Sequence, residues 1–137
     1  NLWHHPYHDL ISQTLDEARQ IFQKSLLLDI HSMPQSSPDL ADIVIGDMNG
    51  HSASSEFTDL IKKELKKFNL TFSMNAPYAG GFITEHHGRP SINKHAIQIE
   101  INRDLYLHEN YKINNEAVCE LRVMLSDIVK SVSSICV

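Results

Sequence analysis

Side chains of two kinds alternate through one stretch in the second half of the chain, His95-Ala96-Ile97-Gln98-Ile99-Glu100-Ile101-Asn102. Successive side chains of a β-strand point to opposite faces, so the isoleucines share one face and Gln98, Glu100 and Asn102 share the other. One interpretation is an edge strand with one solvated face. The other is that Glu100 belongs to an active site, because a carboxylate is costly to bury unless it is paired or faces a wet cleft.

Hydrophobic periodicity in the rest of the chain predicts helices and further short strands. Apolar residues recur at helical spacing over residues 6–24, 54–68 and 114–132. Short apolar runs, which are typical of buried strands, occupy residues 26–31, 43–45 and 70–74. This order predicts an α/β fold in which helices pack on a mostly buried sheet, and the chain shows neither a repeat nor a second domain, so residues 1–137 are expected to form a single domain.

Residues 75–94 form a long connection that is rich in glycine, proline and histidine. A connection of this length inside a compact domain is usually functional. Within it, Arg89 offers a planar guanidinium that suits a substrate carboxylate, although a solvated surface arginine is the simpler alternative. His86 and His87 are adjacent, which disfavours their binding one metal ion together.

His31 ends an apolar run, at the place where open α/β sheets put their ligand sites. Asp29 lies two residues earlier, on the same face of the predicted strand, where it is placed to orient the imidazole. A purely structural histidine at a strand end is the alternative. His5 and His8, one helical turn apart, are a second candidate metal pair, but they lack a third local ligand.

Composition excludes several classes of partner. The chain carries 12 Lys and Arg against 17 Asp and Glu, a net charge of -5, which argues against nucleic-acid binding. No apolar run approaches the ~20 residues needed to span a membrane. Cys119 and Cys136 form no disulfide framework or zinc motif, so we expect a reduced, cytoplasmic setting.

Taken in order, these segments resemble the N-formylglutamate amidohydrolase family. The resemblance extends to about Glu109, and its most specific parts are Pro77-Tyr78-Ala79-Gly80-Gly81 and Gln98-Ile99-Glu100-Ile101-Asn102. It is also carried by His4-His5-Pro6-Tyr7-His8, Leu28-Asp29-Ile30-His31-Ser32, Ile43-Val44-Ile45-Gly46-Asp47 and Gly88-Arg89-Pro90.

The resemblance implies a zinc-carboxypeptidase-like, three-layer fold with a mostly parallel or mixed sheet between helices. It also implies hydrolysis of a small acylated amino acid, N-formyl-L-glutamate, to formate and L-glutamate in histidine degradation. By motif, His31 would be the last of three protein ligands of Zn²⁺ and Glu100 would be the general base. Arg89 and Asn75 would bind the carboxylate of the substrate. We therefore expect Glu100 and His31 to face one cleft at neighbouring strand ends, with Arg89 on its rim.

One departure from the family pattern matters. Family members are nearly twice as long and carry their first two metal ligands upstream, and nothing before His31 supplies that pair. We therefore expect an incomplete, C-terminal part of an amidohydrolase domain that binds zinc weakly and pairs with a missing N-terminal half or with itself. Two alternatives are a non-catalytic binding module on a decayed scaffold, and a related amidase or carboxypeptidase with another acyl-amino-acid substrate.

Overall fold

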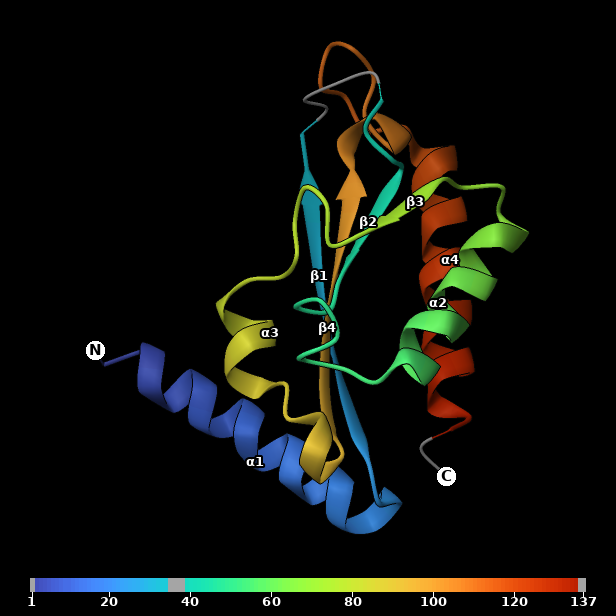
Figure 1. The fold of residues 1–137 in the computed structure, drawn as a ribbon. Helices are drawn as coiled ribbons and strands as arrows, with labels where there is room; N and C mark the ends of the chain where they lie inside the picture. Colours follow the sequence, from blue (N-terminus) through green and yellow to red (C-terminus); the bar gives the residue numbers. More distant parts are fainter. Residues whose placement is uncertain (1, 35–38, 136–137) are drawn as a thin grey trace.

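The computed structural model of the chain describes residues 2–34 and 39–135 and shows one mixed sheet between two layers of helices (Figure 1). The strands are β1 (Ser25–Met33), β2 (Ile43–Gly46), β3 (Phe72–Met74) and β4 (Lys94–Asn102). They lie in the order β1-β4-β2-β3, with β1 parallel to β4, β2 antiparallel to β4, and β3 parallel to β2. The predicted α/β class with helices on a mixed sheet is confirmed.

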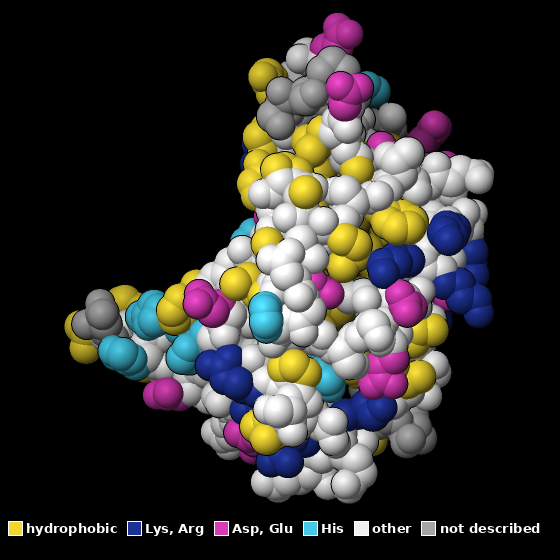
Figure 2. Space-filling model, in the orientation of Figure 1, with side chains coloured by type: hydrophobic (Ala, Val, Ile, Leu, Met, Phe, Trp, Pro, Cys, Tyr) yellow, Lys and Arg dark blue, Asp and Glu magenta, His cyan; other side chains and the backbone are white. Residues whose placement is uncertain are grey.

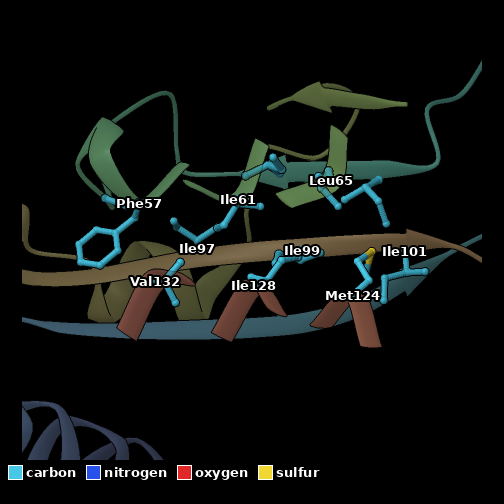
Figure 3. Packing of buried hydrophobic residues seen from close by; sticks show 12 residues of the cluster. Phe57, Ile61, Leu65, Ile97, Ile99, Ile101, Met124, Ile128 and Val132 are labelled. Atoms are coloured by element: carbon cyan, nitrogen blue, oxygen red, sulfur yellow. The ribbon is translucent and has the colours of Figure 1, made fainter. Parts of the chain in front are cut away.

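Two helices cover one face of the sheet, α2 (Ser55–Lys67) and α4 (Asn115–Ser133). Figure 3 shows the isoleucines of β4 packed against both of them. The buried side chains there are Phe57, Ile61 and Leu65 of α2, Ile97, Ile99 and Ile101 of β4, and Met124, Ile128 and Val132 of α4. Burial of this apolar surface is the main stabilising contribution to the fold.

β4 is a central strand, flanked by β1 and β2, and all nine of its residues are buried. The interpretation of this stretch as an edge strand with a solvated face is therefore wrong. Its polar residues Gln98 and Glu100 are 6% and 7% exposed, so they lie in the interior although they face away from the isoleucines. These residues are buried because β4 lies between β1 and β2, and the alternation of residues within β4 does not reveal the order of the strands.

The opposite face is covered incompletely by α1 (His4–Phe22) and α3 (Phe82–His87). A groove of about 670 Å³ lies between α1, β1 and α4, and its lining is almost entirely apolar; it includes Leu15, Leu26 and Val132. On α1 itself, Leu10 and Ile21 are 63% and 70% exposed. Among the described residues, no helix is long and apolar enough to cross a membrane.

The segment predicted as one long connection, residues 75–94, contains the helix α3 and a 3-10 turn at Pro90–Ile92. The sequence predicts a connection here but neither of these two short elements. A helix of six residues is too short for hydrophobic periodicity to reveal it. Cys136 lies outside the described residues, whereas Cys119 is an exposed free thiol.

Candidate active site

His31 and Glu100 are register partners on the parallel strands β1 and β4. Their side chains project from the same face of the sheet, and His31 Nδ1 lies 3.9 Å from Glu100 Oε1. The predicted meeting of these two residues at neighbouring strand ends is confirmed. The side chain of His31 is 48% exposed and that of Glu100 only 9%, so the imidazole opens to solvent while the carboxylate lies deeper.

Each of these side chains is held by the residue two positions earlier on its own strand. Asp29 Oδ1 lies 3.0 Å from His31 Nε2, as the sequence predicts. Gln98 Nε2 donates to Glu100 Oε1 over 2.5 Å, a contact that the sequence analysis missed. The available signal was the i, i+2 spacing, which places Gln98 on the same face as Glu100.

The connection after β3 crosses the sheet directly over β2. Gly46 is the register partner of Gln98, and a Cβ atom at Gly46 would come within 2.7 Å of the backbone of Ala79 and Gly80. Only glycine permits this approach. A Cβ atom at Gly81 would lie 3.3 Å from Gln98 Oε1, so the same connection packs against the amide end of the Gln98 side chain.

Asn75 anchors this connection to the turn after β2. Its Oδ1 accepts hydrogen bonds from the backbone N–H groups of Asp47 and Asn49, and its Nδ2 donates to Asp47 Oδ1. Asn75 also has a left-handed backbone with φ of 58°, which asparagine tolerates better than most residues. This geometry gives Asn75 a structural role, and its contact with a substrate stays a prediction.

Arg89 lies far from His31 and Glu100. It forms an antiparallel bridge with Lys94, the first residue of β4. Glu100 is six residues further along that strand, a distance of about 20 Å at roughly 3.3 Å per residue. The guanidinium donates to the carbonyl groups of Glu85 and Gly88. The expectation that Arg89 lies on the rim of the His31–Glu100 site is wrong, because the connection returns to the opposite end of β4.

A second group of histidines joins α1 to α3. His8 Nδ1 and His87 Nε2 are 3.0 Å apart, both side chains are buried, and His4 and His86 lie beside them. Burial, followed by the neighbouring His86, lowers the pKa of His87 to about 4. Burial also lowers the pKa of His8. Figure 2 shows histidine side chains gathered near the N-terminal end of α1.

Residues 1–107 match the sequence model of the N-formylglutamate amidohydrolase family. The chain belongs to this family. The N-formylglutamate deformylases of Pseudomonas putida and Pseudomonas aeruginosa are each 30% identical to the chain over 110 residues, which cover 76% of the chain and 41% of each relative. The chain thus spans less than half the length of these curated relatives.

Solved structures agree with this assignment. The N-formylglutamate amidohydrolase from Ralstonia eutropha JMP134 superposes with a TM-score of 0.82 at 30% identity, covering 96% of the chain and 50% of the relative. The gene product Atu2144 from Agrobacterium tumefaciens superposes with a TM-score of 0.67 at 25% identity, covering 95% of the chain and 49% of that protein.

The described residues of this family member fit only part of a zinc centre. His31 has the environment of a metal-binding histidine, because one ring nitrogen contacts a carboxylate and so fixes the orientation of the ring. Zinc sites in proteins need at least three protein ligands, however. Within residues 2–34 and 39–135, no group of three or more His, Cys, Asp or Glu side chains is arranged to hold a metal ion.

Proposed function

We propose that this chain supplies the general-base part of an active site that hydrolyses N-formyl-L-glutamate to formate and L-glutamate, a step of histidine degradation in the cytoplasm. The observation that carries the proposal is the buried carboxylate of Glu100, held by Gln98 and facing His31 from the neighbouring strand. Membership of the N-formylglutamate amidohydrolase family supports the choice of substrate.

In this proposal, Glu100 accepts a proton from the attacking water as the water oxygen forms a bond to the formyl carbon. The carbon–nitrogen bond then breaks, and Glu100 returns the proton to the leaving nitrogen, which becomes the amine of glutamate. The deep position of Glu100 beside an exposed His31 suits this role, because the carboxylate is largely shielded from solvent while the neighbouring imidazole remains accessible.

We assign His31 as one ligand of a Zn²⁺ ion, which when bound would polarise the formyl group and make its water more acidic. The remaining ligands come, in this proposal, from outside the described residues, because no three or more His, Cys, Asp or Glu side chains among these residues are arranged to hold a metal ion.

Association with a second polypeptide segment is part of the same proposal. β1 is an edge strand, and the groove that it lines together with α1 and α4 is almost entirely apolar. An apolar surface of this kind is typical of an interaction site. We infer that it pairs with a segment equivalent to the other half of the Ralstonia relative, or with a second copy of the chain, to complete a zinc-carboxypeptidase-like fold.

Asn75 remains a predicted ligand of the substrate carboxylate, and its present hydrogen bonds would have to be exchanged for the substrate. Arg89 is not assigned this role, because it lies beside Lys94, about 20 Å from Glu100 at roughly 3.3 Å per residue of β4, and N-formyl-L-glutamate is too short to reach both. Arg89→Ala should therefore leave KM for N-formyl-L-glutamate unchanged, as should Lys112→Ala at an exposed position. A raised KM in Arg89→Ala alone would return Arg89 to the proposed site.

A second candidate function is a non-catalytic module that binds an acylated amino acid. The observation that favours it is that the described residues contain no complete set of metal ligands. The two functions differ in one measurement, the release of formate from N-formyl-L-glutamate in the presence of Zn²⁺. Formate release is measured for two samples, the chain alone and the chain mixed with the polypeptide equivalent to the other half of the Ralstonia relative.

Deformylation by either sample that disappears in Glu100→Gln, but persists in the exposed control Glu17→Gln, supports the enzyme. Substrate binding without formate release from either sample supports the binding module. Deformylation that survives Glu100→Gln contradicts the role of Glu100.

A further inference from the structure

Gln98 makes a short, buried contact with the proposed general base. Its Nε2 lies 2.5 Å from Glu100 Oε1, and Gln98 as a whole is 6% exposed. Hydrogen bonds to an ionised carboxylate are shorter and stronger than neutral ones. Because the carboxylate can only accept, the amide of Gln98 must present its N–H to Glu100 and its oxygen elsewhere.

The other end of this amide has no partner in the part of the chain that the structure describes. Gln98 Oε1 is buried and accepts no hydrogen bond there. It points at the connection near Gly81, where a Cβ atom would lie 3.3 Å away. A buried acceptor without a donor destabilises a fold, and each such atom in a native protein needs an explanation. An apolar side chain of similar size, such as methionine, would fill the same space without this cost.

The arrangement on β1 supplies the explanation. Asp29 contacts His31 from two residues earlier on β1, and Gln98 contacts Glu100 from two residues earlier on β4. Asp29 is the register partner of Gln98, and His31 is the register partner of Glu100. The four side chains thus form two matched pairs. In each pair the later residue, His31 or Glu100, belongs to the proposed site, and the residue two positions earlier contacts and orients it.

We propose that Gln98 is a positioning residue for Glu100, an inference that rests on the proposed function. Both described contacts of the Glu100 carboxylate, to Gln98 Nε2 and to His31 Nδ1, fall on Oε1. Gln98 therefore fixes the rotation of the carboxylate and turns Oε2 toward the water whose proton it accepts. The structure tolerates the unpaired Oε1 of Gln98 because the amide serves orientation rather than stability.

A double-mutant cycle on the deformylating form of the protein tests whether Gln98 acts through Glu100. Gln98→Met should lower kcat about 10- to 100-fold, the loss typical of a residue that orients a catalytic group, and leave KM within about twofold. In the Glu100→Gln background the same substitution should cause no further loss. Equal losses of kcat in both backgrounds, or an unchanged kcat in the first, would overturn the proposal.

The chain offers a matched control. Gln13 Nε2 donates to Glu17 Oε1 over 2.8 Å on the exposed surface of α1, which is the same chemical contact away from the site. Gln13→Met should leave kcat unchanged. A similar loss in Gln13→Met would mean that the loss in Gln98→Met does not report on the site, and it would count against positioning.

NMR of the chain keeps the inference testable if no deformylation is found, a result that would count against the proposed function alone. One side-chain amide proton of Gln98 should resonate downfield of the Gln13 amide protons, because its acceptor is a buried carboxylate over a short distance. Glu100→Ala should return it to the ordinary range without changing the backbone spectrum of α2 and α4. A Gln98 resonance that does not respond to Glu100→Ala would overturn the inference.

Discussion

His31 and Glu100, 69 positions apart in the sequence, occupy the same register position on neighbouring parallel strands, with His31 Nδ1 3.9 Å from Glu100 Oε1. One side chain can bind a metal ion and the other can move a proton, so substitutions at the two positions should have different effects. Glu100→Gln keeps the size of the side chain but cannot accept a proton from water.

In the active form, Glu100→Gln should therefore lower kcat by about 10²–10⁴ and leave the zinc content unchanged. His31→Ala should lose zinc together with activity, because it removes a proposed ligand. Metal analysis and steady-state kinetics of the two variants, measured side by side, make the comparison. Loss of zinc in Glu100→Gln, or near-normal turnover, would contradict the assigned roles.

The buried pair His8–His87 should make the free energy of unfolding depend on pH. The pKa of His87 is lowered from 6.5 to about 4 in the folded chain, so the unfolded state binds more protons between these values. Stability should be fully present above about pH 6.5 and fall as the pH drops toward 4. At about 1.4 kcal/mol per pH unit, the difference corresponds to a loss of up to about 3 kcal/mol.

Urea unfolding between pH 4 and pH 7 checks this expectation. His87→Gln removes the titrating group while keeping a polar side chain, and it should flatten the dependence in that range. His108→Gln changes an exposed histidine and should leave the dependence as it is. A steep dependence that persists in His87→Gln would show that His87 is not its source. His95, whose pKa is also lowered by burial, would then be the next histidine to replace.

Gly46→Ala should destabilise the chain by about 1–3 kcal/mol, as overpacking in an interior usually does. The new methyl group would meet the backbone of Ala79 and Gly80 at 2.7 Å, and a backbone moves less readily than a side chain. Gly81→Ala is the matched control, since its nearest neighbour lies at 3.3 Å and is the end of the Gln98 side chain. Thermal unfolding of the two variants should show the larger loss for Gly46→Ala, and equal losses would contradict the close crossing.

Asn75→Ala should lower stability for two separable reasons. It removes the hydrogen bonds to Asp47 and Asn49, and it places alanine at a φ of 58°. Asn75→Gly removes only the hydrogen bonds, because glycine adopts positive φ readily. We expect a loss of about 1–3 kcal/mol from the hydrogen bonds in both variants and roughly 1 kcal/mol more in Asn75→Ala. If chemical unfolding gives Asn75→Gly a lower free energy of unfolding than Asn75→Ala, the expected contribution of the left-handed backbone is wrong.

Local pattern was sufficient for the main elements of this chain. Helical spacing located α1, α2 and α4, because each buries a stripe of apolar side chains at intervals of three and four residues. Alternation in β4 assigned Ile97, Ile99 and Ile101 to one face and Gln98 and Glu100 to the other, because successive side chains of a strand point to opposite faces. The spacing of Asp29 and His31 likewise placed both on one face of β1, where they make the predicted contact.

The sheet order and the long-range contacts were decided only by the tertiary structure. β4 is central because β1 and β2 both pair with it, and the alternation of its own residues is compatible with an edge position as well. The contact between His8 and His87 joins residues that are 79 positions apart, and Arg89 lies beside Lys94 because the connection turns back there. Periodicity records which face a side chain occupies within its own strand or helix, whereas the neighbour on that face depends on how distant segments pair.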